Sequence, residues 1–234
     1  MCVRVGVYID GFNLYYGGRA HARNAGVTTG WKWLDIRALS SLLATRHFGP
    51  QASVVRVVYC TAKVSGATNP TAATDQNVYL RALREVLQAG DTVDLGKFFE
   101  KTKTRPLATA DARGRPVILT AASPVRVKDR NGGDVRDATF MVTVSDREEK
   151  GSDVNVATRL LIDTLEARID AAIVISNDSD LELPVREARA RIPVGVVNPN
   201  TIPTAGSLRK RPHSGPGGHW ESQLALADFY ACQP

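Results

Sequence analysis

The sequence predicts an α/β protein with a three-layer α/β/α architecture, a mainly parallel central sheet and an antiparallel hairpin insertion. Short runs rich in valine and isoleucine recur along the 234 residues, and helical patterns separate them. Strands joined by helices pair in parallel and are covered by helices on both faces. Acidic residues follow the ends of two strands, at the edge where open parallel sheets bind ligands.

The first half of the chain supplies three expected strands and two expected helices. The strands are expected at 3–9, 53–60 and 93–99, and the helices at 34–48 and 74–88. The strand segments are apolar and β-branched, whereas the helical segments repeat their apolar residues with helical spacing. Gly49-Pro50 ends the first of these helices and Gly90 ends the second.

The second half continues the alternation after an interruption. Helices are expected at 151–168 and 181–191, and strands at 171–176 and 193–197. Residues 100–148 contain Gly, Pro and Asn-Gly turn signals and are expected to form a β-hairpin. After Asn198 a Pro- and Gly-rich mobile connector is expected, followed by a short helix or strand near 221–229. The prediction is one domain, 1–234, with a 100–148 insertion and a 199–234 C-terminal extension.

Composition excludes several classes of protein. The chain is 43% hydrophobic and 23% charged, which is ordinary for a globular protein and excludes fibrous or disordered chains. The segment 1–9 lacks the length and the cleavage site of a signal peptide, so none is expected there, and no window approaches about 18 uncharged apolar residues. We therefore expect a cytoplasmic protein without a membrane partner, and its oligomeric state, including a homo-oligomer, stays open. Cys2, Cys60 and Cys232 are far apart and are expected to be free thiols.

Positive charge is concentrated in the expected insertion. The net charge is +6, and the segment 97–137 holds ten basic and five acidic residues. Such a segment suits a phosphate backbone, although a solvated loop has the same composition. The candidate RNA-binding residues are Lys101, Lys103, Arg105, Arg126, Lys128, Arg130 and Lys150. RNA is the expected partner, with single-stranded DNA as a further candidate.

Four aspartates are expected to meet at one edge of the sheet. They are Asp10 after the first strand, Asp153 in the first turn of a helix, and Asp178 and Asp180 after the strand at 171–176. Asn13 adds a polar side chain near Asp10. Helix capping or a plain turn would also explain each aspartate taken alone.

Such a group of carboxylates is costly unless a cation neutralises it. Mg²⁺ or Mn²⁺ prefers oxygen ligands, whereas zinc would favour His or Cys. Paired divalent ions activate water and stabilise the leaving oxygen in phosphodiester hydrolysis. Sequence fingerprints of phosphate-binding loops, dinucleotide-binding folds and nucleophilic serines are absent from the chain.

Three motifs resemble the NYN domain family, a PIN-like group of metal-dependent ribonucleases that includes LabA-like bacterial proteins. They are Tyr8-Ile-Asp-Gly-Phe-Asn-Leu14, Lys150-Gly-Ser-Asp-Val154, and Val174-Ile-Ser-Asn-Asp-Ser-Asp-Leu181 followed by Pro184 and Val185. The resemblance implies a PIN-like Rossmannoid fold over about residues 1–198. It also implies Mg²⁺ or Mn²⁺ on Asp10, Asp153, Asp178 and Asp180 near Asn13, and products with a 5′-phosphate and a 3′-hydroxyl. Asn177 and Leu181 replace the Gly and Phe of many members, and neither replacement removes an implied ligand.

The leading functional prediction is a metal-dependent endoribonuclease with a two-metal mechanism, in which Asn13 and Ser176 or Ser179 orient the ligands. A catalytically weak nucleic-acid-binding regulatory module is the first alternative. Metal-assisted hydrolysis of a small phosphate substrate is the second. The aromatic residues Tyr15, Tyr16, Trp31 and Trp33 either stack single-stranded bases or pack the core and its rim.

Overall fold

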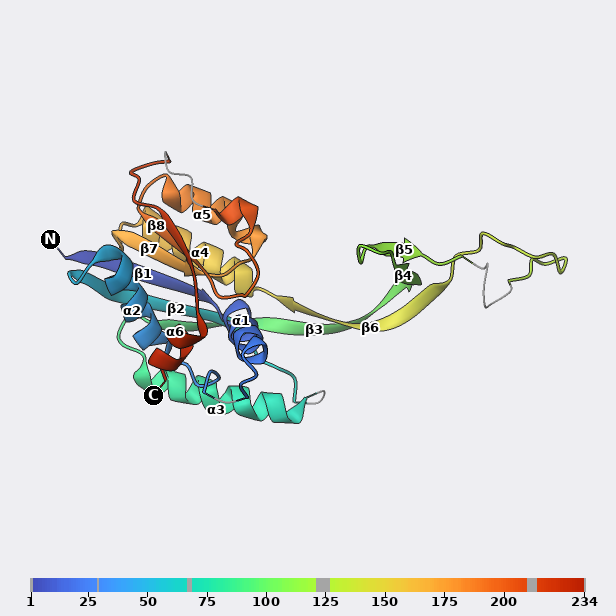
Figure 1. The fold of residues 1–234 in the computed structure, drawn as a ribbon, viewed down its shortest axis with the longest axis horizontal. Coiled ribbons are helices and arrows are strands. Elements are labelled where there is room, and N and C mark those ends of the chain that lie inside the picture. The colour runs from blue at the N-terminus through green and yellow to red at the C-terminus, as the bar shows by residue number, and fades with distance from the viewer. Residues whose placement is uncertain (1, 29, 67–68, 121–126, 210–213, 234) are drawn as a thin grey trace. The chain divides into compact units, whose positions relative to one another are not determined.

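A seven-stranded sheet forms the centre of the protein. The computed structural model describes residues 2–28, 30–66, 69–120, 127–209 and 214–233 (Figure 1). The strand order is β6-β3-β2-β1-β7-β8-β9, and the pairings from β3 through to β9 are parallel. The bounds are β1 Val3–Asp10, β2 Ala52–Ala62, β3 Thr92–Pro106, β6 Met141–Lys150, β7 Ala171–Ile175, β8 Val194–Asn198 and β9 Trp220–Gln223.

Helices cover both faces of this sheet, which confirms the predicted three-layer α/β/α architecture. One face carries α1 Gly11–Asn24, α2 Ile36–Phe48, α3 Pro70–Val86 and α6 Leu226–Ala231, and the other carries α4 Ser152–Leu165 and α5 Glu182–Arg189. Two short 3₁₀ helices, η1 Ser179–Leu181 and η2 Gly206–Leu208, lie in connections. In the part of the chain that the structure describes, none of the helices is long and apolar enough to cross a bilayer.

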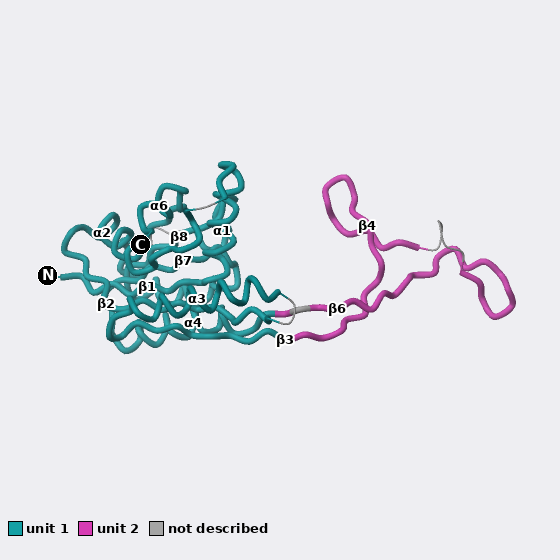
Figure 2. The backbone as a smooth tube through the Cα atoms, turned by 90° about the horizontal axis from the view of Figure 1, so that it is seen from below, with its two compact units in different colours: residues 1–98, 149–234 teal, residues 99–148 magenta. Residues whose placement is uncertain are grey.

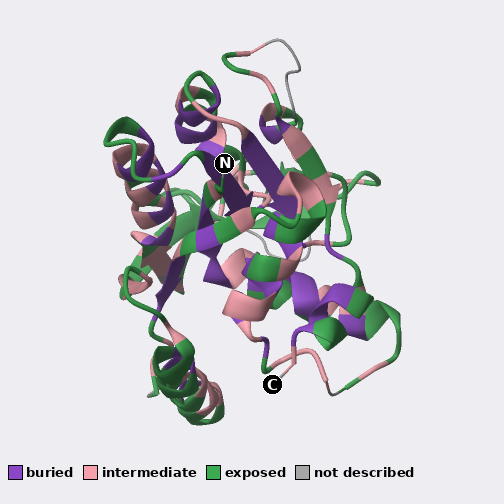
Figure 3. Cartoon of the chain, turned by 90° about the vertical axis from the view of Figure 1, so that its left-hand side faces the viewer, coloured by how far each residue is buried: buried purple, intermediate pink, exposed green. Residues whose placement is uncertain are grey.

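Alternation along the strands builds two cores. In β1, Val5, Val7 and Ile9 point to the face covered by α1, α2, α3 and α6, whereas Tyr8 points to the face covered by α4 and α5. Every residue of β7 and β8 is buried, as expected for parallel strands that are covered on both faces (Figure 3). Burying one such Val or Ile side chain contributes about 1.5–3 kcal/mol.

The residues after Asp10 form a helix, although no helix was expected between residues 9 and 34. Helix α1 contains Gly17 and Gly18, which lower helix propensity and hide the pattern. Its first turn is capped by the Asp10 side chain, which accepts a hydrogen bond from the backbone N–H of Asn13. The capped helix start fixes where Asp10 and Asn13 lie.

The C-terminal segment completes the sheet and the core. Strand β9 pairs in parallel with β8, and α6 buries Phe229, so both of the alternatives expected near 221–229 occur, one after the other. Part of the expected mobile connector packs against the core, because Leu208 of η2 is fully buried, whereas residues 201–203 are exposed. The Arg189 guanidinium donates to the carbonyl oxygens of Leu208 and Arg209.

The chain divides into two compact units (Figure 2). One comprises residues 1–98 and 149–234, and the other comprises residues 99–148. The second unit contains the antiparallel pair β4 Ala108–Ala110 and β5 Pro116–Ile118, so the predicted antiparallel insertion is confirmed. Asp111 and Asp129 each accept backbone hydrogen bonds within tight turns of this unit.

Candidate metal centre

Asp10 is the most deeply buried carboxylate of the site. Asp10 is the last residue of β1 and is 3% exposed. Asn13 donates to it twice, from the backbone nitrogen at 3.0 Å and from Nδ2 at 2.9 Å, and the Ser176 hydroxyl donates at 3.0 Å. The Asn13 side-chain oxygen is itself engaged, because it accepts from the Asn177 backbone nitrogen and from Nδ2 of Asn200. Asn13 therefore orients Asp10.

Asp153 and Asp178 approach Asp10 from the first turn of α4 and the end of β7. Helix α4 begins after Gly151, whose φ of 103° suits glycine, and Asp153 lies in its first turn. Asp178 caps η1 by accepting from the Asp180 backbone nitrogen at 3.0 Å. One carboxylate oxygen from each of Asp10, Asp153 and Asp178 lies within 4.8 Å of the others.

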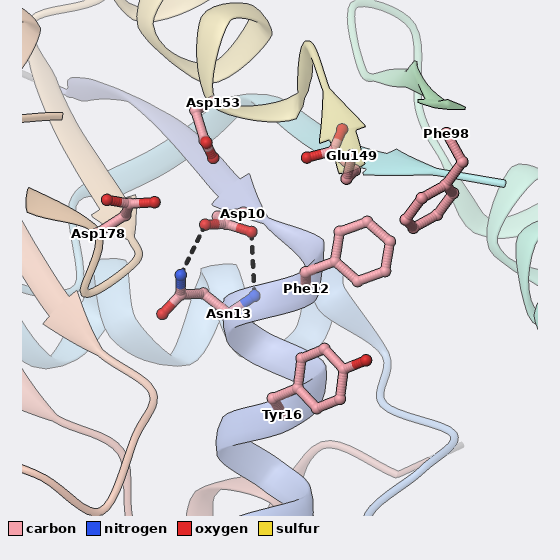
Figure 4. Close-up of a pocket in the computed structure, with 8 residues that line it drawn as sticks. All are labelled: Asp10, Phe12, Asn13, Tyr16, Phe98, Glu149, Asp153 and Asp178. Carbon is pink, nitrogen blue, oxygen red and sulfur yellow. Dashed lines mark hydrogen bonds between the residues drawn. The ribbon is translucent and has the colours of Figure 1, made fainter. Parts of the chain in front are cut away.

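These three carboxylates line a pocket of about 250 Å³ (Figure 4). The residues that line it are Asp10, Phe12, Asn13, Tyr16, Phe98, Glu149, Asp153 and Asp178. Asp180 is exposed and does not belong to the three-carboxylate group. Glu149 was not predicted from the sequence, although the acidic pair Glu148-Glu149 directly precedes the Lys150-Gly-Ser-Asp motif. Glu149 accepts hydrogen bonds from the backbone nitrogen and hydroxyl of Ser152.

The site concentrates negative charge. Burial, followed by the charges of Asp10, Asp178, Glu149 and Asp180, raises the pKa of Asp153 to about 7. Burial also raises the pKa of Asp10, against the opposing effect of its hydrogen bonds from Asn13 and Ser176. Among the described residues, no ion pair includes Asp10, Asp153 or Asp178. The donor set is all oxygen and anionic, which fits a hard divalent cation such as Mg²⁺ or Mn²⁺.

Comparisons with known proteins leave the family unassigned. No protein-family model matches the chain. The chain is similar to 6-hydroxy-3-succinoylpyridine 3-monooxygenase HspA from Pseudomonas putida, at 27% identity over 99% of this chain and 70% of that protein. The chain is also similar to the crystal structure of a protein of unknown function from Vibrio parahaemolyticus. The match covers 94% of this chain and 92% of that chain, at 17% identity and a TM-score of 0.44. The resemblance to the NYN domain family thus stays a sequence-based prediction.

Most of the predicted RNA-binding residues lie in the unit 99–148, and several of them already have acidic partners. Lys101 pairs with Glu148, Lys103 with Asp146, and Lys128 with Asp134. Arg105 and Arg130 are exposed, and Lys150 ends β6 in the larger unit. Arg126 lies outside the described residues.

Three residues of the predicted aromatic cluster are in contact. The Tyr15 ring lies between Trp31 and Tyr16, with ring centroids 5.3 Å and 5.5 Å away, and Tyr16 also lines the carboxylate pocket. Trp33 packs elsewhere, 6.3 Å from the ring of Tyr79.

Proposed function

We propose that the chain is a divalent-metal-dependent nuclease that hydrolyses phosphodiester bonds in RNA. The observation that carries this proposal is the approach of Asp10, Asp153 and Asp178 to within 4.8 Å of one another without a pairing cation among the described residues. Carboxylates so close repel one another, and a divalent cation removes that cost. Asp10, Asp153 and Asp178 would hold Mg²⁺ or Mn²⁺ there, and the bound cation would supply an activated water and stabilise the leaving oxygen.

The chain's own residues divide the work. Asp10, Asp153 and Asp178 would hold the cation, and Glu149 adds negative charge beside them. Asn13 and Ser176 hold the Asp10 carboxylate in one orientation through three hydrogen bonds. Groups that orient metal ligands in this way typically change metal affinity or activity by about 10- to 100-fold when removed.

RNA as the substrate rests on charge and on the NYN resemblance. The unit 99–148 holds ten basic and seven acidic residues. Its net charge is therefore positive even when Asp146 and Glu148 of β6 are included. A positive surface binds phosphate backbones. The resemblance implies products with a 5′-phosphate and a 3′-hydroxyl.

The decisive test is cleavage of a labelled single-stranded RNA in Mn²⁺ or Mg²⁺ by the wild type, Asp178→Asn and Asp180→Asn. Both variants remove one carboxylate charge from the same motif, but only Asp178 belongs to the three-carboxylate group. We expect Asp178→Asn to lose about 100-fold or more of the rate, and Asp180→Asn to lose less.

EDTA should abolish cleavage, and matched melting temperatures would show that both variants fold. Undiminished cleavage by Asp178→Asn or in EDTA would exclude the metal mechanism. Salt-dependent RNA binding without cleavage in either metal would favour the regulatory binding module instead.

A second candidate is a monooxygenase acting on a hydroxypyridine ring. It is favoured by the 27% identity to the Pseudomonas putida enzyme, because that similarity extends over 99% of this chain. Such a reaction places one atom of O₂ in the ring and reduces the other to water with two electrons from a donor. Oxygen uptake that depends on 6-hydroxy-3-succinoylpyridine, in the presence of a reduced nicotinamide and a flavin, would support it. No such uptake, together with metal-dependent RNA cleavage, would favour the nuclease.

A further inference from the structure

An aromatic wall borders the carboxylates. Phe12 and Tyr16 are one turn apart on α1, and Phe98 comes from β3; all three line the same pocket as Asp10 and Asp153. The Phe12 and Tyr16 rings are nearly parallel, at an interplanar angle of 22° and a centroid distance of 6.3 Å. Phe98 meets Phe12 edge to face at 5.7 Å. Figure 4 shows the three rings on one side of the pocket and the aspartates on the other.

Tyr16 is the most exposed ring of the wall. It is 55% exposed, whereas Phe12 and Phe98 are only partly exposed, and the Tyr15 ring meets it edge to face at 5.5 Å. Phe98 braces Phe12 from the side, which fixes the orientation of the Phe12 ring. The wall therefore offers an oriented, partly uncovered aromatic surface beside a candidate metal site.

We propose that this wall of Phe12, Tyr16 and Phe98 stacks one unpaired nucleobase of the substrate, next to the phosphodiester that lies at the carboxylates. The inference rests on the proposed nuclease function and names its substrate class as single-stranded RNA. In a duplex, both faces of a base are covered by its neighbours, so only an unpaired base can lie against a protein ring. Stacking of this kind accepts every base, because each base has a π-face.

The size of the pocket agrees with a single base. Its volume of about 250 Å³ lies below the roughly 300–1,000 Å³ of pockets that enclose whole drug-sized ligands. One base and its phosphate would enter, and the rest of the strand would lie outside.

The test is an abasic scan. A set of single-stranded RNAs, each lacking the base at one position, is bound to full-length Asp178→Asn protein in Mn²⁺ and measured by anisotropy. The same set is bound to Asp178→Asn carrying Tyr16→Ala, Phe12→Leu or the control Trp33→Ala. Phe12→Leu keeps an apolar side chain but removes the π-face, and Trp33 is an exposed aromatic residue outside the pocket that packs on Tyr79.

We expect one abasic position, next to the scissile bond found with the wild type, to weaken binding by about 5- to 100-fold. Tyr16→Ala and Phe12→Leu should abolish that position's effect, whereas Trp33→Ala should keep it. An abasic profile that is equally flat in all proteins would overturn the inference, as would equal affinity for duplex and single-stranded RNA. Displacement of the bound RNA by a free hydroxypyridine, together with a flat abasic profile, would also overturn the inference. It would indicate that the wall binds a small aromatic ring instead.

The two proposals fail differently. A flat abasic profile, with cleavage that still depends on Asp178, would remove base stacking and leave the nuclease proposal intact. If one abasic position weakens binding only when Tyr16 is present, but the wild type cleaves no RNA in either metal, the nuclease proposal falls. The single-strand-binding site would then stand alone.

Discussion

Asp10 shows how one residue can serve both the fold and the chemistry. Its carboxylate caps α1, so the helix start and the candidate metal ligand are the same group. Three hydrogen bonds from Asn13 and Ser176 hold it, and Asn200 and Asn177 in turn hold Asn13. The carboxylate is thereby oriented before any cation binds, which lowers the entropy cost of forming the site.

Asp153 makes the stability of the metal-free protein depend on pH. Its pKa is about 7 in the folded chain and near 3.8 in the unfolded chain, so between those values the folded state binds more protons. The free energy of unfolding therefore falls as pH rises through that window, and the cost is fully present above pH 7. In EDTA, Asp153→Asn should raise the melting temperature more at pH 8 than at pH 5.

The control for this prediction is added metal. Mg²⁺ should stabilise the wild type at pH 8 more than it stabilises Asp153→Asn, because a cation that binds only the folded state raises its stability. If Asp153→Asn shifts the melting temperature equally at both pH values in EDTA, the raised pKa is not felt by the fold.

Among the secondary-structure elements, the sequence predicted those that have a clear apolar periodicity or a polar residue at a strand end. Strands β1, β2, β3, β7 and β8 and helices α2 to α5 were predicted from apolar spacing, and Asp10, Asp153 and Asp178 were predicted from the polarity at strand and helix ends. Helix α1 was not predicted because its glycines are typical of turns. Glycine is needed there for close packing against other segments, which the sequence alone does not show. Glu149 was not predicted for a related reason, because its position in the pocket depends on how the chain passes from β6 into α4.

At Gly17, helix α1 packs closely against the backbone of Pro199. A Cβ added there would lie 2.2 Å from the carbonyl oxygen of Pro199, a backbone atom that cannot easily move. Although Ala favours helices by up to about 1 kcal/mol over Gly, overpacking costs about 1–3 kcal/mol. Gly17→Ala should therefore lower the free energy of unfolding by urea.

The matched control is Gly206→Ala in η2, where an added Cβ meets nothing within 4 Å. Gly206→Ala should leave stability nearly unchanged. Gly17→Ala should also weaken Mn²⁺ binding, because Pro199 adjoins Asn200, which holds Asn13. A Gly17→Ala protein as stable as the Gly206→Ala protein would show that the contact relaxes without cost.

At the scale of the whole molecule, the smaller unit is less positive than its sequence first indicated. The basic window 97–137 ends before β6, and β6 supplies Asp146 and Glu148 opposite Lys103 and Lys101. These lysines are exposed or half-exposed, so the pairs add little to stability. Their larger effect is on binding, because a phosphate must compete with the acidic partner.

Lys128 and Arg130 test this competition within one turn of the chain. Lys128 pairs with Asp134 at 2.6 Å, whereas Arg130 is exposed and joins none of the ion pairs found in the described ranges. Each phosphate contact made with single-stranded RNA contributes about 0.7 to the slope of log affinity against log salt. Arg130→Ala should thus lower that slope by about 0.7, and Lys128→Ala should lower it by less. Binding isotherms measured across a range of KCl concentrations decide the matter, and equal slopes for the wild type and Arg130→Ala would place the phosphate contacts elsewhere.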